Sequence, residues 1–390
     1  MSARGAETHA TALPRAERAL RMFCLLLAGA SHFVWLASLD AVFGTSELAR
    51  RDWSAFRAAG ALVLDGRASE LYLPRPGGFP FLHPPVVAIL AAPFSRFGDV
   101  AFYAGTIGLA AAGLVLSALA LHRIARARVD TPTLLALASA PWIVALILGQ
   151  PIALALAAWL GGLALLVRRP ALAGATWGLC ALKPTLLPAL VLFALVHDRR
   201  ALGSLLAVAA SVLALGLVLG GDVSLAWLAA MAREAAPAAE SWKQHTLYAL
   251  LRATLPNPLA STLWALAALG LGGWTLRSVA RGSAGLRELG SLALATIALS
   301  PYAYDYDALV LVIPCAALAL ERERYARAAW WTTVTIAGLT GVAQYASFVF
   351  LQRGPPFTGA FAAAWLIAEL ATSPPRRRAF PRRVTDPLPP

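Results

Sequence analysis

The feature that most constrains this chain is a series of long, uninterrupted apolar runs separated by short polar segments. Runs of about 20 residues match the hydrocarbon thickness of a bilayer. Because backbone groups in lipid must be hydrogen-bonded within their own segment, these runs are predicted to be helices. With 59% hydrophobic and 14% charged residues, the chain of 390 residues has more apolar surface than the core of one soluble domain would bury. The sequence therefore predicts an all-α polytopic membrane protein.

The apolar runs predict about 11 to 13 transmembrane helices. They lie at about 20–42, 99–121, 132–148, 151–167, 170–182, 186–197, 201–221, 258–279, 288–300, 304–320, 328–349 and 357–372. Residues 84–97 are also apolar, but they are few and include three prolines. Since proline interrupts a helix, we expect a re-entrant or shallow helix there.

The polar segments between these runs divide the chain. Residues 1–18 are predicted to be a disordered cytoplasmic tail, 19–373 a single transmembrane domain, and 374–390 a basic, proline-rich cytoplasmic tail. Two long outer loops are expected at 43–83 and 222–257. The stretch from Asp52 to Leu64 in the first loop is amphipathic, which predicts a helix lying along the membrane surface.

The formal net charge of +13 raises the question of nucleic-acid binding. The arginines, however, form short clusters between apolar runs, as the positive-inside rule describes. This pattern places both termini in the cytoplasm and predicts no nucleic-acid partner. Together with the Arg-, Ala- and Leu-rich composition, it indicates a bacterial inner-membrane protein. Polar turns at 149–151, 183–185 and 300–307 fall on the opposite face, so we expect the functional site to face the exterior.

Asp52 opens the amphipathic stretch and is a candidate general base, which would take a proton from an acceptor hydroxyl. Its alternative role is to cap the helix, and Asp40 and Asp65 are competing carboxylates. Lys183 stands in an apolar stretch at a proline break, where it would hold a phosphate group. The alternative is a lysine that snorkels to the interface.

The segment from Ser300 to Asp307 contains several more candidates for a binding site. They are Tyr302, Tyr304, Asp305 and Asp307. The tyrosines alone would also fit an interfacial aromatic belt. His83 and His245 are possible partners for a phosphate or a hydroxyl, although a lone histidine is often structural.

Several motifs of soluble enzymes are missing from the sequence. It contains no Gly-rich phosphate loop, no nucleotide-binding signature and no His/Cys metal cluster. If the chain transfers a sugar, a soluble nucleotide-sugar donor would need a globular domain, for which the chain has no room. A donor carried on a lipid fits better. We predict neither a metal nor a cofactor.

The order of these features carries a family resemblance. Along the chain stand Asp52 with Phe56, the segment from Gly66 to Tyr72, an aromatic segment from Phe79 to Pro85 that continues to Pro93, Gly149-Gln150, an Arg-Arg pair before Ala173-Gly174, Lys183-Pro184, and Ser300-Pro301 with the polar cluster after it. In this order and spacing, the chain resembles glycosyltransferase family 87. These are polyprenyl-phosphate-mannose-dependent mannosyltransferase-like membrane proteins of the GT-C class.

The resemblance implies a GT-C-like helical bundle and a membrane hexosyltransferase with a polyprenyl-phosphate sugar as donor. The sugar would be mannose-like and would be transferred, with inversion, to a lipid or glycan acceptor. Carried onto this sequence, Asp52 would be the base, Lys183 and Gln150 would face the donor phosphate and sugar, and Tyr302–Asp307 would close the pocket. Tyr72, Lys243 and His245 are possible acceptor or loop contacts.

Two other classes of protein remain compatible with the sequence. A polytopic transporter or lipid/glycan flippase would also have many spans and a polar outer face. Its charges would line several spans through the bilayer, whereas here they cluster near helix ends. The third reading is a scaffold for envelope assembly that has lost its activity.

Overall fold

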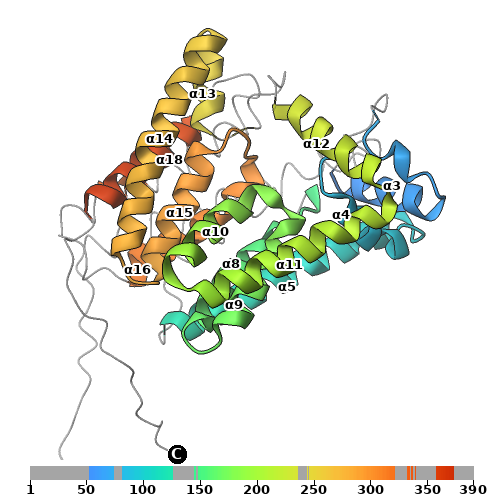
Figure 1. The fold of residues 1–390 in the computed structure, drawn as a ribbon, viewed down its shortest axis with the longest axis horizontal. Helices are drawn as coiled ribbons and strands as arrows, with labels where there is room; N and C mark the ends of the chain where they lie inside the picture. The colour runs from blue at the N-terminus through green and yellow to red at the C-terminus, as the bar shows by residue number, and fades with distance from the viewer. Residues whose placement is uncertain are drawn as a thin grey trace, which may run out of the picture.

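The computed structural model describes residues 52–73, 81–125, 145, 148–235, 244, 246–320, 332–333, 335–336, 339 and 357–372. In these ranges the chain is helical, and pairing of strand type is limited to one isolated antiparallel bridge between Gln244 and Tyr304. The predicted all-helical architecture is therefore confirmed for the described residues. Figure 1 shows one group of helices formed by α14, α15, α16 and α18 and another formed by α5, α8, α9 and α11.

The described residues between 52 and 94 form short helices that pack on one another. They are α3 (Asp52–Leu64), the 3₁₀ turn η1 (Ala68–Glu70), α4 (Pro85–Ala91) and η2 (Ala92–Phe94). Gly60 lets α3 cross α4 closely, because a Cβ there would lie 2.8 Å from the carbonyl carbon of Ala91. Arg57 of α3 pairs with Asp99 at 2.7 Å and donates to the carbonyl of Ser95 at 3.3 Å. The helix predicted from Asp52 to Leu64 is confirmed, and within residues 84–97 the chain forms the short helices α4 and η2.

The middle of the chain folds into helices that reverse direction at short turns. They are α5 (Asp99–Ala125), α8 (Ile152–Leu166), α9 (Pro170–Gly178), η3 (Leu179–Leu182), η4 (Pro184–Leu186), α10 (Leu187–His197), α11 (Arg199–Gly216) and η5 (Leu217–Leu219). Proline stands at the start of α9 and of η4, where a missing N–H costs nothing. Asp198 caps α11 by accepting from the backbone N–H groups of Arg200 and Ala201.

The last third of the chain adds seven elements. They are α12 (Gly221–Ala235), α13 (Leu247–Thr254), α14 (Asn257–Arg281), α15 (Leu286–Leu299), η7 (Asp305–Leu311), α16 (Val312–Leu320) and α18 (Phe357–Ala371). Residues 222–257 were predicted only as a long loop. The helices α12 and α13 within them were not predicted.

Three described helices are long and apolar enough to cross a membrane, namely Asp99–Ile124, Arg199–Leu219 and Asn257–Arg281. The other apolar helices have 10–17 residues. They are shorter than the roughly 20 residues of a straight span. Two of them, Pro170–Leu182 and Pro184–His197, are divided by the break at Lys183-Pro184. The spans expected at 20–42, 132–148 and 328–349 lie wholly or largely outside the described residues.

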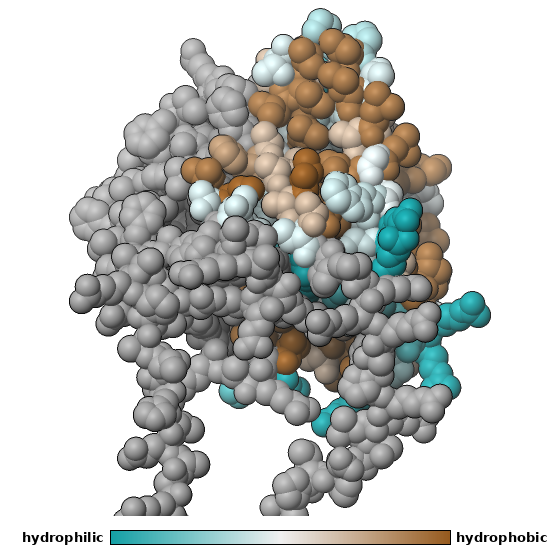
Figure 2. All heavy atoms as spheres, turned by 90° about the vertical axis from the view of Figure 1, so that its left-hand side faces the viewer, coloured by the Kyte–Doolittle hydropathy of each residue, from teal (hydrophilic) through white to brown (hydrophobic). Residues whose placement is uncertain are grey.

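The outer surface of α14 is apolar. Figure 2 shows a broad hydrophobic surface on the side where α14 lies, with most of the hydrophilic side chains below it. α14 contributes the exposed side chains of Leu259, Leu263, Leu266, Leu269 and Trp274. An apolar patch of this kind is unfavourable in water, and lipid chains are its natural surroundings.

The short turns between the described helices lie at two opposite ends. The turns at 167–169, Asp198 and 282–285 lie at one end, which we call the arginine end. Its basic residues are Arg168, Arg169, Arg199, Arg200, Arg281 and Arg287. The turns at 149–151, at Lys183 and at 300–304 lie at the opposite end.

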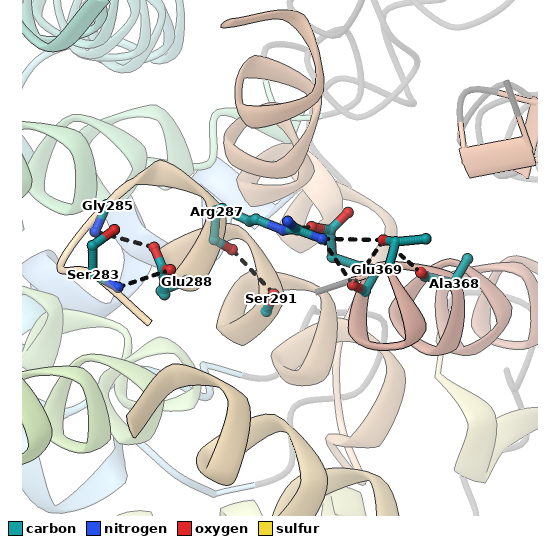
Figure 3. Close-up of polar contacts among 8 residues, drawn as sticks. Ser283, Gly285, Arg287, Glu288, Ser291, Ala368 and Glu369 are labelled. Atoms are coloured by element: carbon teal, nitrogen blue, oxygen red, sulfur yellow. Dashed lines mark hydrogen bonds and ion pairs between the residues drawn. The ribbon is translucent and has the colours of Figure 1, made fainter. Parts of the chain in front are cut away.

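A buried ion pair joins α15 to α18 at the arginine end (Figure 3). Arg287 Nε lies 2.5 Å from Glu369 Oε1, and both side chains are at most 5% exposed. Arg287 Nη2 also donates to the carbonyl of Glu369 and to Thr372 Oγ1, each at 3.1 Å. Beside it, Glu288 accepts from the backbone N–H groups of Ser283 and Gly285 and so caps α15. These contacts fix the last described helix to the bundle.

The crossing of α9 and α11 depends on Gly174, where a Cβ would overlap the carbonyl oxygen of Ala201. We predict that Gly174→Ala destabilises the protein by about 1–3 kcal/mol, since the two helix backbones must separate. The apparent melting temperature of the detergent-purified protein measures the effect. Gly203→Ala in α11 is the control, because nothing lies within 4 Å of its Cβ position. Equal melting temperatures for the two variants would contradict the prediction.

Candidate active site

The hydrogen bond between Asp52 and Gln150 joins two distant parts of the sequence. Gln150 Nε2 donates to Asp52 Oδ2 at 2.6 Å, across 98 positions. Asp52 is the first residue of α3 and is half-buried, whereas Gln150, in the turn before α8, is only 2% exposed. A charge-assisted bond of this length is strong, so the amide holds the carboxylate in one place.

Local packing explains why these two side chains meet. Trp53, next to Asp52, is 1% exposed and packs against Phe102 and Tyr103 of α5. Gly149 has a φ of +68° and lies directly under Trp53. A Cβ at Gly149 would stand 2.7 Å from Trp53 Cβ and 2.8 Å from Thr106 Oγ1. Only glycine adopts this conformation at this distance without strain, and the turn then presents Gln150 to Asp52.

Lys183 and Asp307 form a second pair at the same end of the helices. Lys183 Nζ lies 2.5 Å from Asp307 Oδ1, and the side chains are 12% and 1% exposed. Lys183 occupies the extended residue between η3 and η4, where Pro184 ends the preceding turn. Asp307 Oδ2 accepts from the backbone N–H of Tyr304 at 3.0 Å, which fixes the carboxylate.

Tyr306 and His83 connect the two pairs into one cluster. Lys183 Nζ lies 4.2 Å from the centroid of the Tyr306 ring, and the charge of Asp52 also acts on Tyr306. His83 lies within electrostatic reach of Lys183, and its ring centroid is 4.8 Å from that of Phe56. Burial, reinforced by the positive charge of Lys183, lowers the pKa of His83 to about 3. His83 is therefore neutral at physiological pH.

The tyrosines after Ser300 stand beside this cluster as a row of rings. The centroids of Tyr302 and Tyr304 are 4.8 Å apart, and those of Tyr304 and Tyr306 are 5.5 Å apart. The backbone of Asp305 begins η7, and its side chain is outside what the structure describes. Tyr306 lies within the predicted segment Tyr302–Asp307 but was not named individually as a candidate, although its place between Asp305 and Asp307 was a signal that could have identified it.

The remaining candidates lie at the edge of the cluster or beyond the described residues. Tyr72 is 7% exposed, and its hydroxyl donates to the carbonyl of His83 at 2.7 Å. Burial raises the pKa of Tyr72 above its usual value, and the residue supports the loop that carries His83. Lys243, His245 and Asp40 are outside the described ranges. The exposed residue Asp65 lies one residue past the far end of α3.

α12 also braces the loop that carries His83. Trp227 Nε1 donates to the carbonyl of Leu82 at 3.0 Å, and Arg233 Nη2 donates to the carbonyl of Tyr72 at 3.3 Å. Two long-range hydrogen bonds thus hold the chain just before His83.

Within the described ranges, no group of three or more His, Cys, Asp and Glu side chains is placed to hold a metal ion. Chemically, the cluster combines an oriented carboxylate, a buried ammonium group, a neutral imidazole and a row of phenol rings. This set suits proton removal from a hydroxyl and binding of an anionic group next to it.

Gly149 and Gly66 provide a matched test of how the Asp52–Gln150 contact is built. Both have positive φ, +68° and +71°, but nothing lies within 4 Å of a Cβ at Gly66. We expect Gly66→Ala to cost only backbone strain, about 1–2 kcal/mol. Gly149→Ala should cost more, because it also displaces Trp53 and moves Gln150 from Asp52. Thermal unfolding in detergent measures both variants, and a larger loss for Gly66→Ala would refute this account.

The lowered pKa of His83 predicts acid sensitivity. Below its usual pKa of 6.5 the unfolded chain binds a proton that the folded chain does not bind until about pH 3. Stability is therefore lost as the pH falls through this window, by at most about 1.4 kcal/mol per pH unit for one proton. Melting curves from pH 7 to 4 should show a smaller loss for His83→Gln than for the wild type. The exposed His122→Gln is the control and should follow the wild type.

Comparison with known proteins adds the family. No curated protein and no solved structure gives a significant match. The family model described as glycosyltransferase family 87 matches residues 81–301, which is more than half of the chain. The matched range contains His83, Gln150 and Lys183, and it leaves Asp52 and Tyr302–Asp307 outside. The chain therefore belongs to glycosyltransferase family 87 and is a membrane glycosyltransferase.

Proposed function

We propose that the protein transfers a mannose-like hexose from a polyprenyl-phosphate sugar to a hydroxyl group of a lipid or glycan acceptor. Asp52 acts as the general base, and the transfer inverts the anomeric centre. The observation that carries this proposal is the cluster in which Asp52, held by Gln150, acts electrostatically on Tyr306, whose ring centroid lies 4.2 Å from Lys183 Nζ. A base and a cation in one cluster are what this reaction needs on its two sides.

On the acceptor side, the Asp52 carboxylate removes the hydroxyl proton as the oxygen attacks the anomeric carbon. The bond between that carbon and the phosphate oxygen breaks, and its electron pair leaves with the phosphate. The proton remains on Asp52 until it passes to water. General-base catalysis of this kind contributes about 10²–10⁴ in rate, and it needs the carboxylate to be fixed in place before the substrate binds.

On the donor side, Lys183 binds the phosphate. An ammonium group has three N–H donors, and the ion pair with Asp307 occupies one side of it. The other donors are available to a phosphate oxygen, where they stabilise the charge that develops as the bond breaks. Because phosphate leaves as a stable anion, the reaction requires no general acid, and we propose that it uses neither a metal nor a cofactor.

The other members of the cluster suit the sugar and the acceptor. Neutral His83 carries one hydrogen-bond donor and one acceptor, both suitable for hydroxyl groups. The rings of Tyr302 and Tyr304 offer flat apolar faces and hydroxyl groups beside the Lys183–Asp307 pair. Tyr72, Lys243 and His245 are proposed as contacts of the outer loops with the acceptor.

The distribution of charge supports an orientation in the membrane. The cluster lies at the end of the helices opposite the arginine end. By the positive-inside rule, we place the arginine end and both termini in the cytoplasm of a bacterial cell. The cluster then opens to the exterior of the inner membrane, where it would meet lipid-linked sugars.

The central test is Asp52→Asn, which keeps the size of the side chain and removes its basicity. We expect a fall in transfer of about 10²–10⁴-fold, measured with membranes, radiolabelled polyprenyl-phosphate sugars and a native lipid extract. Asp65→Asn is the matched control, because Asp65 is an exposed carboxylate at the far end of the same helix. It should transfer at the wild-type rate.

Equal transfer by Asp52→Asn and the wild type would show that Asp52 is not the base. If the wild type transferred from none of the donors but moved the lipid-linked sugar across vesicle membranes, the proposed donor chemistry would be wrong. A flippase role would then replace it.

A further inference from the structure

Gln150 makes its side-chain hydrogen bond with the base and not with the cation of the cluster. Its Nε2 donates to Asp52 Oδ2 at 2.6 Å. The orientation of the amide follows from chemistry, because a carboxylate only accepts and the NH₂ group must therefore face it. Among the side-chain hydrogen bonds of the described residues, none joins Gln150 to Lys183. The resemblance assigned Gln150 to the donor, whereas its contact lies on the acceptor side.

The backbone around Gln150 is built as a rigid support. Its N–H donates to the carbonyl of Ala145 at 2.8 Å, and the residue is 2% exposed. Gly149, in the left-handed conformation, packs under Trp53, and α8 begins three residues later. A side chain held this firmly restricts the rotation of the carboxylate to which it is bonded.

We propose that Gln150 is a positioning residue for Asp52. Its amide N–H keeps the carboxylate ionised and turned toward the acceptor hydroxyl, and it does not bind the donor phosphate. The inference rests on the proposed role of Asp52 as the base. Without the amide, the carboxylate would rotate and would protonate at a higher pH, because a hydrogen bond to the charged form favours that form.

Charged or titratable side chains also stand on η7, where the charge of Asp52 acts on Tyr306, and on the elements packed against α3. η7 contributes Tyr306 and Asp307, and Asp307 is paired with Lys183. α5 contributes Asp99 and Tyr103, and η1 contributes Glu70, of which the two carboxylates pair with Arg57 and Arg67. α4 and η2 carry no titratable side chain. Because these partners remain in place when Gln150 is replaced, a change in Asp52 reports on the amide.

The experiment uses the full-length protein with Gln150→Met and Gln150→Glu. Methionine has the size of glutamine but donates no hydrogen bond, and glutamate places a second carboxylate against Asp52. The first readout is the pH dependence of carbodiimide labelling of Asp52, followed by mass spectrometry without substrate. The second readout is transfer, with kcat and the KM for the donor measured from pH 5 to 9. Ser117→Ala is the control for the general effect of changing a buried polar residue, because Ser117 is buried on a different helix, α5.

For Gln150→Met we expect kcat to fall about 10- to 100-fold, which is less than loss of the base itself would cause. The KM for the donor should change little. The labelling curve and the acidic limb of the pH profile should both move to higher pH, by roughly one unit. Gln150→Glu should move them further, since neighbouring carboxylates cannot both ionise easily. Ser117→Ala should leave both curves where the wild type has them.

An unchanged labelling curve in Gln150→Met would overturn the inference. So would a raised donor KM with an unchanged kcat, which would make Gln150 a ligand of the donor. The labelling experiment does not depend on transfer. If the wild type failed to transfer from any polyprenyl-phosphate sugar, the proposed function would fall, while the labelling curves would still decide whether Gln150 controls Asp52.

Discussion

A charge inside a lipid-embedded protein must be paired, and the described structure is organised around two such pairs at opposite ends of the helices. At the arginine end, Arg287 donates hydrogen bonds to Glu369 and Thr372, and these bonds hold α18 against α15. At the other end, Lys183 meets one carboxylate, Asp307, and one ring face. Arg287 is bonded to three protein acceptors, whereas the remaining donors of Lys183 are proposed to serve a ligand. The same requirement thus yields a structural contact at one end and the proposed binding site at the other.

Close helix contacts transmit this organisation to the site. Without a hydrophobic driving force between helices in lipid, packing depends on small residues that let backbones approach. Gly174 does this between α9 and α11, and Gly290 does it against Pro314. Gly149 likewise allows a close approach to Trp53. This approach brings the side chain of Gln150 to Asp52 and so shapes the proposed active site. The geometry of the proposed base is therefore a product of helix packing.

The parts that the sequence predicted are those governed by local rules. The helix from Asp52 follows from an amphipathic pattern, and the break at Lys183 follows from Pro184. The partnerships could not be predicted, because they join segments far apart. Nothing local in Gln150 identifies Asp52 as its partner 98 positions away. The Arg287–Glu369 pair likewise depends on how α18 returns to the bundle. α12 and α13 were not predicted because helices were expected from long apolar runs, whereas these two helices have only 15 and 8 residues and carry polar side chains.

The arrangement of charges also bears on how basic Asp52 can be. If Lys183 were paired directly with Asp52, the positive charge would stabilise the carboxylate and weaken it as a base. In the structure Asp307 takes that place, and the partner that Asp52 receives from α8's turn is a neutral amide. His83 adds no charge, since burial and Lys183 keep it neutral. In the proposed reaction, Asp307 thus separates the two functions of the cluster. It keeps the ammonium group in position for the phosphate while the carboxylate of Asp52 retains its affinity for a proton.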